Sequence, residues 1–183
     1  MFEIILPVVF FVSIFLFLSL VFWRFNPRKY ISSVTVASAY DSWTEDKLLE
    51  RLWGEHIHLG FYPEVKKKID FREAKVKFVH ELVNWSGLYN LPRGSRILDV
   101  GCGIGGSSRI LAKYYGFNVT GITISPVQVK RAQELTPDEC TCKFRVMDAL
   151  NLQFKDGEFD GIWSVEAGAH MNDKNKFDNE ILR

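Results

Sequence analysis

Cysteine is scarce in this sequence, and its scarcity excludes a small secreted domain held together by disulfides. The 183 residues include three cysteines, Cys102, Cys140 and Cys142, an odd and sparse set that fits a reducing compartment. The Cys140-x-Cys142 pair has the spacing of metal ligands, but no second pair accompanies it, and we interpret it as two thiols at the beginning of a strand. The His56-x-His58 pair likewise has no evident third ligand, so no metal is expected.

An excess of one charge sign is also lacking, which argues against nucleic acid as a partner. The chain has 23 Lys and Arg residues against 22 Asp and Glu, a net charge of +1. No basic tract is interleaved with aromatic residues. The length is sufficient for one ordinary domain with its own core.

Charged residues are missing from a long stretch near the N-terminus. Residues 4–23 are almost wholly apolar, and a helix of about twenty residues rises about 30 Å, the thickness of a bilayer's hydrocarbon core. Arg24 and Arg28 follow the stretch, so the positive-inside rule places the domain beyond it in the cytoplasm. A cleaved secretory signal is the alternative, but the start carries no Lys or Arg. We therefore predict a single-pass membrane anchor over 1–25.

The rest of the chain divides into three parts by composition. Residues 26–38 contain an Asn-Pro pair and a small polar run, and we predict a linker there. Residues 39–92 are expected to form a helical cap and a lead-in helix that begins after Asp70. Residues 93–183 alternate between expected strands and helices, which indicates a parallel, doubly wound α/β sheet. The expected strands are 97–100, 118–123, 142–146 and 159–164.

A glycine-rich stretch over 97–111 organises this domain. It predicts a buried strand, a sharp turn and the first turns of a helix. Glycines have no Cβ, so the backbone can turn tightly and a ligand can approach it closely. The N–H groups at the beginning of the helix have no partner within it and can face a polar or anionic ligand group. Asp99, at the end of the strand, is placed to accept hydrogen bonds from a ligand or from loop N–H groups.

Two nucleotide-binding patterns overlap in this stretch. Gly101-x-Gly103-x-x-Gly106 fits the dinucleotide fingerprint, whereas Asp99-x-Gly101-x-Gly103-x-Gly105 fits the loop of S-adenosylmethionine-dependent methyltransferases. An NAD site needs an acidic residue at the end of the next strand. That strand instead ends in the hydroxyls of Thr123 and Ser125, which disfavours NAD. A glycine-rich turn in some other α/β domain remains the third interpretation.

Several segments resemble the tocopherol and plastoquinone methyltransferases of photosynthetic organisms. They are residues 39–46, 53–60, 97–111, 121–126, 129–137 and 163–171. The resemblance covers nearly the whole chain after Ser33 and implies a class I S-adenosylmethionine methyltransferase, Rossmann-like fold. With its N-terminal apolar stretch, the chain is most similar to the cyanobacterial 2-methyl-6-phytylbenzoquinol methyltransferases within this group.

The resemblance implies a cofactor, S-adenosylmethionine, and a set of residues that bind it. The glycines would border its methionine and ribose, a hydroxyl at the end of the second strand would replace the usual ribose carboxylate, and an aspartate after the third strand would pair with adenine. The predicted cofactor-binding residues are Asp99, Gly101, Gly103, Gly105, Thr123, Ser125 and Asp148. For Asp148 the alternative role is to cap a turn. All lie at or near the carboxyl ends of expected strands, where doubly wound sheets bind ligands.

The implied reaction methylates a prenylated benzoquinol, a 2-methyl-6-phytyl or solanesyl compound, in tocopherol and plastoquinone biosynthesis. A quinol ring carbon is a poor nucleophile until a ring hydroxyl loses its proton, so a positioned base helps. Glu166 and His170 follow the fourth expected strand, and we predict that one of them is this catalytic base. A structural role for the pair is the alternative. A bilayer-dissolved acceptor also gives a membrane anchor a purpose, on a plasma or thylakoid membrane.

Other acceptors and another class of function stay open at this point. γ-Tocopherol, a small amine or a lipid double bond are alternative acceptors, because related methyltransferases share the Gly-Ile-Thr-x-Ser strand end. The chain ends at Arg183 inside an expected helix, with four expected strands, and we expect a fragment of a longer enzyme. An inactive membrane-bound module is therefore the alternative to an enzyme, since the fourth strand would leave an open sheet edge.

Overall fold

The computed structural model describes residues 13–19, 33–63 and 69–183, and it divides the chain into two compact units, 1–31 and 32–183. In the first unit, residues 13–19 are helical. Among the described residues no helix is both long and apolar enough to cross a membrane.

This finding contradicts the prediction of a single-pass membrane protein with its domain on the cytoplasmic side. The predicted transmembrane helix and the membrane as a partner lack support for the same reason. Most of the predicted span, residues 4–12 and 20–23, lies outside the described part of the chain.

The second unit begins with two helices of the expected cap. Helix α2 (Ser33–Glu45) starts inside the stretch predicted to be a linker. Helix α3 (Leu48–Trp53) follows after Lys47, whose φ of 54° makes the turn between them. Gly54, with a φ of 81°, ends α3.

Helix α4 (Phe71–Ser86) forms where the sequence predicts the lead-in helix. The Asp70 carboxylate accepts hydrogen bonds from the N–H groups of Arg72 and Glu73, which satisfies two of the unpaired donors at the helix start. Gly87 in a left-handed conformation ends the helix. The short 3-10 helix η1 (Leu88–Asn90) then leads to the sheet.

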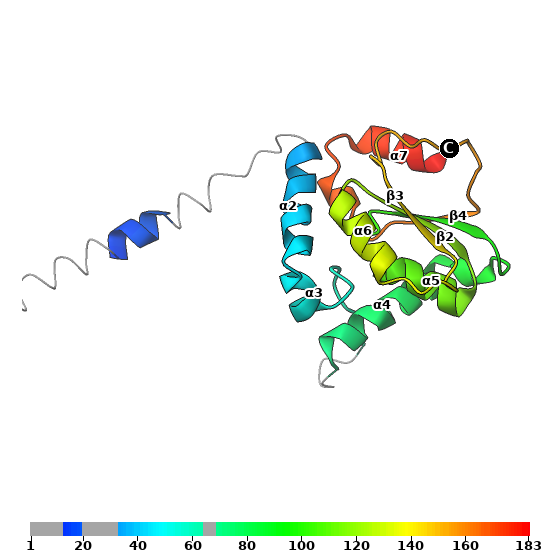
Figure 1. The fold of residues 1–183 in the computed structure, drawn as a ribbon, viewed down its shortest axis with the longest axis horizontal. Helices are drawn as coiled ribbons and strands as arrows, with labels where there is room; N and C mark the ends of the chain where they lie inside the picture. Colours follow the sequence, from blue (N-terminus) through cyan, green and yellow to red (C-terminus); the bar gives the residue numbers. More distant parts are fainter. Residues whose placement is uncertain (1–12, 20–32, 64–68) are drawn as a thin grey trace, which may run out of the picture. The chain divides into compact units, whose positions relative to one another are not determined.

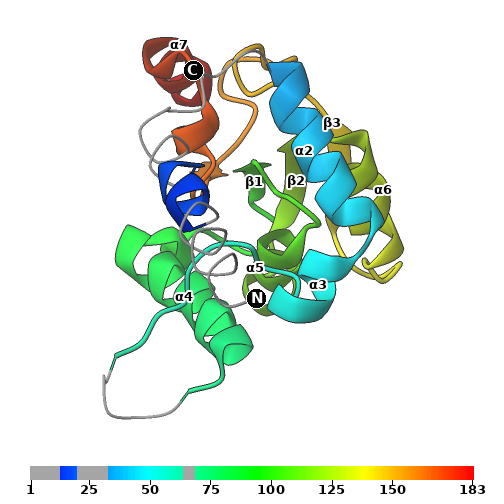
Figure 2. The same cartoon turned by 90° about the vertical axis from the view of Figure 1, so that its left-hand side faces the viewer.

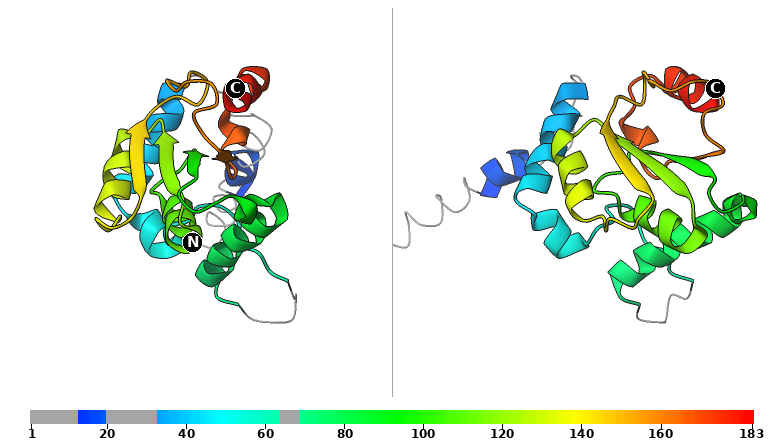
Figure 3. Two further views of the ribbon diagram at one scale, coloured as in Figure 1. Left: turned by 90° about the vertical axis from the view of Figure 1, so that its right-hand side faces the viewer. Right: turned by 45° about the vertical axis from the view of Figure 1, so that its right-hand side comes forward.

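The sheet has four parallel strands in the order β3-β2-β1-β4, seen side by side in the left view of Figure 3. The strands are β1 (Arg96–Val100), β2 (Asn118–Thr123), β3 (Cys142–Val146) and β4 (Gly161–Trp163). The connecting elements are α5 (Gly106–Tyr115), α6 (Pro126–Glu134), the 3-10 helix η2 (Gly168–His170) and α7 (Lys174–Leu182). This topology confirms the class I methyltransferase-like α/β sheet.

Both faces of the sheet are covered, as its near-continuous apolar strands require. On one face, Ile97 and Val119 pack with Val79 of α4 and Leu111 of α5. On the other face, Leu98, Val100 and Ile122 pack with Phe177 of α7. Figure 1 shows the same three layers, with α7 above the sheet and α4 and α5 below it.

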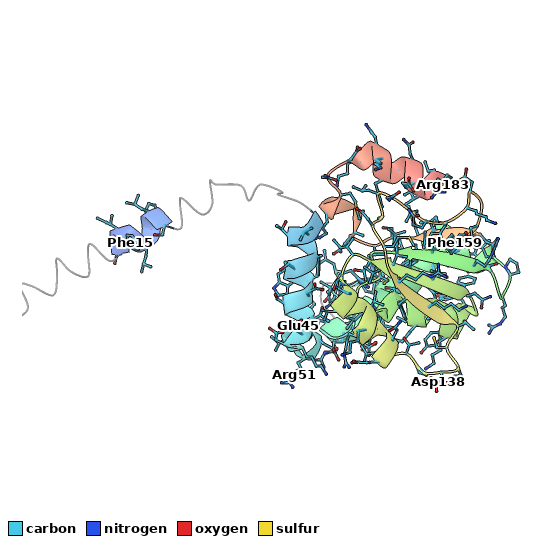
Figure 4. The ribbon with its side chains drawn as sticks, turned by 45° about the horizontal axis from the view of Figure 1, so that its top comes forward. Phe15, Glu45, Arg51, Asp138, Phe159 and Arg183 are labelled. Atoms are coloured by element: carbon cyan, nitrogen blue, oxygen red, sulfur yellow. The ribbon has the colours of Figure 1, made fainter. Side chains whose placement is uncertain are left out.

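Helix α2 lies beside α6, outside the sheet (Figure 2). A side-chain pair holds the neighbouring α3 to the same helix: Arg131 of α6 lies 2.6 Å from a Glu50 carboxylate oxygen. The Arg131 hydrogen bond lowers the pKa of Glu50. At the far end of the unit, Arg183 bonds the backbone carbonyls of Phe154 and Leu152, and Figure 4 shows it on the same side as Phe159.

Candidate functional site

Asp99 is a buried carboxyl group at the carboxyl end of the central strand β1. Its exposed fraction is 3%, and its Oδ2 accepts a hydrogen bond from the Ser108 hydroxyl of α5 at 2.5 Å. Burial raises the pKa of Asp99 to about 7, and the Ser108 hydrogen bond opposes that rise only in part. The group is therefore balanced between its neutral and charged forms near neutral pH.

The loop after Asp99 uses glycine where the backbone requires it. Gly101, Gly103 and Gly105 have φ values of 78°, 55° and 81°, in the left-handed region that favours glycine. A Cβ added to Gly103 would meet nothing within 4 Å, whereas one added to Gly105 would press on the Phe144 ring. The loop thus packs on β3 on one side and has open space at Gly103, where a ligand can lie against the backbone.

The hydroxyls at the end of β2 are already engaged within the protein. Thr123 Oγ1 donates to Gln128 Oε1 at 2.7 Å, and Ser125 Oγ accepts from the Gln128 N–H as the N-cap of α6. The Ser125 hydroxyl also donates to the Asp41 carboxylate of α2 at 2.5 Å. Both side chains are buried. A carboxylate therefore does reach the end of β2, but it comes from α2.

Asp148 lies exposed after β3, where the sequence places it. Its Oδ1 accepts a hydrogen bond from the Leu150 N–H at 2.9 Å, within a turn closed by the Asn151 N–H on the Asp148 carbonyl. The side chain caps this turn. Its role toward adenine stays a prediction.

Glu166 and His170 both face the N-terminal cap. Glu166 has a φ of 58°, an uncommon conformation outside glycine, and its Oε1 accepts a hydrogen bond from the Leu59 N–H at 3.1 Å. His170 Nε2 lies 3.0 Å from the Tyr40 hydroxyl of α2. Burial raises the pKa of Tyr40, and the nearby Glu166 charge raises it further. A carboxylate, an imidazole and a phenol thus gather beyond the end of β4, a set that can accept and move a proton.

His56 and His58 form a buried pair beside the glycine loop. His58 Nδ1 donates to the Leu59 carbonyl at 2.8 Å, so its Nε2 is left to accept from His56 Nδ1 at 3.2 Å. Burial lowers the pKa of His56 to about 3, and the neighbouring His58 adds to that effect. His56 packs against Gly106. In the described part of the chain no three His, Cys, Asp or Glu side chains are grouped to hold a metal.

Three partners in this site were not assigned from the sequence. They are Ser108 on Asp99, Asp41 on Ser125, and Tyr40 on His170. Residues 39–60 are rich in aromatic side chains, Tyr40 among them. Nothing in the sequence, however, indicates which side chain of this segment reaches the candidate site.

A cleft of about 1200 Å³ runs along the outer side of α5, between α3, α4 and the loop after α6. His56, Gly106 and Arg109 line the end of the cleft that borders the glycine loop. Arg109 is paired there with Glu55 at 2.5 Å. The cleft contains none of the polar groups at the carboxyl ends of the strands, so those groups and not the cleft define the candidate site.

Comparison with known proteins finds methyltransferases among the relatives of this chain. Residues 98–183 match the methyltransferase domain family. The chain is 63% identical over 156 residues to the 2-methyl-6-phytyl-1,4-hydroquinone methyltransferase of Synechocystis sp., with 85% of this chain and 49% of that protein aligned. It is 42% identical over 146 residues to the chloroplastic tocopherol O-methyltransferase of Arabidopsis thaliana, with 74% and 42% aligned. The chain thus spans about half the length of the curated relatives it matches.

Solved structures share the same architecture. A structure titled as a putative sarcosine dimethylglycine methyltransferase from Galdieria sulphuraria is 30% identical to this chain. Its TM-score is 0.68, over 77% of this chain and 54% of that one. The [4+2]-cyclase SpnF is 28% identical with a TM-score of 0.75, over 83% and 56%. Because one of these is a cyclase by its title, the architecture alone does not fix the reaction.

Proposed function

The chain carries a domain of the methyltransferase family, and from this we propose that it transfers a methyl group from S-adenosylmethionine to a ring carbon of a prenylated benzoquinol. The single observation that carries the proposal is the 63% identity to the Synechocystis hydroquinone methyltransferase over 85% of this chain. The proton-accepting groups beyond β4 agree with it. The open glycine loop agrees with it as well.

The residues at the carboxyl end of β1 fit the cofactor. When bound, S-adenosylmethionine supplies a methyl group on a positively charged sulfur. The open space at Gly103 admits the ligand against the backbone. A cationic ligand near Asp99 would lower its pKa from about 7 and so favour the carboxylate form. The Asp41 carboxylate lies at the end of β2, where it could accept a hydrogen bond from a ribose hydroxyl. The hydrogen bond from the Ser125 hydroxyl holds it there.

The groups beyond β4 fit the acceptor. With Nε2–H donating to the Tyr40 oxygen at 3.0 Å, Nδ1 of neutral His170 carries the lone pair that can take a proton from a quinol hydroxyl. Glu166 can hold the resulting imidazolium by its negative charge. Loss of the proton makes the ring carbon nucleophilic. The chain then has only to hold that carbon in line with the methyl group in a dry pocket.

γ-Tocopherol is the second candidate acceptor, supported by the 42% identity to the Arabidopsis thaliana tocopherol O-methyltransferase. In that case the nucleophile would be a phenol oxygen or a ring carbon of the chromanol. The same proton-accepting groups would serve it.

Two measurements test the proposal in sequence. The first is equilibrium binding of labelled S-adenosylmethionine to the chain and to Asp99→Ala, with Asp156→Ala as a surface control. The second is transfer of label to 2-methyl-6-phytylbenzoquinol and to γ-tocopherol. Binding that Asp99→Ala alone loses, with transfer to the benzoquinol, supports the proposal. A folded chain that binds no S-adenosylmethionine, or one that labels only γ-tocopherol, overturns it.

The catalytic groups are tested by substitution. Glu166→Gln and His170→Asn are compared with Glu158→Gln, a carboxylate in an exposed turn. A positioned base contributes about 10²- to 10⁴-fold to the rate, so one of the first two variants should lose that much while binding of S-adenosylmethionine is kept. Equal rates in all variants would remove both residues from the chemistry.

A further inference from the structure

Two thiols outside the candidate site lie in direct contact. Cys140 Sγ donates to Cys142 Sγ at a distance of 3.4 Å, and both cysteines are unpaired. Cys140 is half-buried and lines the cleft beside α5, so reagents in solution can reach it. It lies in the loop after α6, which also contains Asp138 at the rim of the domain in Figure 4.

The backbone holds the two thiols together. The Cys142 N–H donates to the Cys140 carbonyl at 2.8 Å, a tight turn that shortens the distance between the two residues. Thr141, between them, is held by hydrogen bonds of both its side chain and its backbone. Its hydroxyl donates to the Phe117 carbonyl at 2.7 Å, and its carbonyl accepts from the Val119 N–H at 2.9 Å. These bonds position both thiols before any reaction occurs.

We propose that Cys140 and Cys142 are a modification site, an oxidisable dithiol that a small disulfide such as oxidised glutathione converts reversibly into an intramolecular disulfide. Cys140 attacks the oxidant first, forming a mixed disulfide and releasing one reduced thiol. Cys142 then attacks Cys140 Sγ, forming the internal bond and releasing the second thiol. Two protein thiols are oxidised, one disulfide is reduced, and the proton of each cysteine leaves to solvent or to a departing thiolate.

The order of attack follows from the surroundings of the two thiols. Burial raises the pKa of Cys142, and its contact with Cys140 adds to this, so Cys142 is the poorer first nucleophile. Cys142 Sγ also donates to the Ser108 carbonyl at 3.3 Å, which holds it inside the domain. A disulfide closed across one intervening residue is strained, and strained disulfides are readily reduced. The bond would therefore form only under oxidising conditions.

Formation of the disulfide also affects the first turn of α5. Its effect on cofactor binding rests on the proposed function. The Cys142 S–H donates to the Ser108 carbonyl, and the Ser108 hydroxyl donates to Asp99. Oxidation removes that S–H donor beneath the glycine loop. Because an S–H group is a weak donor, we expect its loss to weaken S-adenosylmethionine binding by about tenfold at most.

Intact mass and thiol counting test the modification itself. The folded chain is equilibrated over a range of oxidised to reduced glutathione, quenched, unfolded and alkylated. We expect the number of labels to fall from three to one with a loss of about 2 Da, the mass of two hydrogens. Cys102→Ser should behave in the same way, falling from two labels to none. Cys142→Ser should retain a glutathione adduct on Cys140.

The same glutathione titration, carried out on the chain unfolded in urea, gives the reference for the folded chain. Because the turn positions the thiols, the folded chain should close at an oxidant ratio about tenfold lower or more than the unfolded chain. Wild-type chain that keeps three labels, or that accumulates a stable glutathione adduct on Cys140, overturns the proposal. Equal closure in urea overturns it too. These readouts do not involve S-adenosylmethionine, so failure of the proposed function would appear separately, as absence of binding by the reduced chain.

Discussion

Asp99 places an acidic side chain where its charge is disfavoured, and this gives the first prediction. Its pKa is 3.8 when unperturbed and about 7 in the folded chain, so folding binds a proton. The resulting contribution to stability is complete below pH 4 and is lost as pH rises through 7. Asp99→Asn should remove this loss, on the order of 4 kcal/mol at most. Urea unfolding at pH 5 and pH 8 measures the difference between the two chains.

The urea experiment has a clear negative outcome. If the free energy of unfolding falls equally for wild type and Asp99→Asn between the two pH values, the folded pKa of Asp99 is not raised. Asn can still accept the Ser108 hydrogen bond, so the variant keeps that contact.

Glu166 combines an uncommon backbone conformation with a candidate catalytic side chain. Glu166→Ala and Glu166→Gly both remove the Leu59 hydrogen bond, so they differ only in how well they adopt a φ of 58°. Glycine adopts it freely, and we expect Glu166→Gly to be more stable than Glu166→Ala by about 1 kcal/mol. Thermal unfolding of the two variants measures this. Equal stability would mean that residue 166 is not held in the left-handed region.

At the scale of elements, the missing side chain of Gly121 leaves room beside β2 for side chains of neighbouring segments. A Cβ at this position would come within 2.7 Å of the Phe144 ring and 2.9 Å of the Cys102 Cβ. Gly121→Ala should therefore lower the free energy of unfolding by about 1 to 3 kcal/mol. Phe144→Leu in the same chain should recover part of that loss, and a double-mutant cycle measures the coupling. Strict additivity would show that the ring does not press on β2.

Elements with local signals could be predicted from the sequence. Asp70 begins α4, Ser125 begins α6, and β3 occupies 142–146 as expected. Each of these boundaries is set by hydrogen bonds or dihedral angles within a few residues. The fourth strand is shorter than the expected 159–164, because pairing with β1 extends only over three residues.

Long-range partners could not be predicted in the same way. Helix α2 begins within the expected linker, in a sequence without an apolar periodicity strong enough to indicate it, and it lies beside α6. Asp41 and Ser125 are 84 residues apart in the sequence. The sequence indicated the edge of the sheet where the candidate site lies, but not the side chains that another helix brings to that edge.

On the scale of the whole molecule, the N-terminal segment of the second unit is held by side-chain contacts to α5, α6 and η2, the helices beside the sheet. Tyr40 meets His170, Asp41 meets Ser125, Glu50 meets Arg131, and Glu55 meets Arg109. If this segment covers the cofactor, S-adenosylmethionine should slow amide hydrogen exchange in 39–60 as well as in the glycine loop. The outer helix α7 should serve as the unaffected reference. Protection confined to the glycine loop would show that 39–60 does not cover the ligand.

The contact between Tyr40 and His170 also fixes an order of events during synthesis of the chain. The two residues are separated by 130 positions, and a ribosome that adds about 5 to 20 residues per second needs about 6 to 26 seconds to pass from one to the other. Throughout that interval α2 has no partner beyond β4. Helix α2 can already pack on α6 by then, but its Tyr40 contact beyond β4 forms only after His170 has been made.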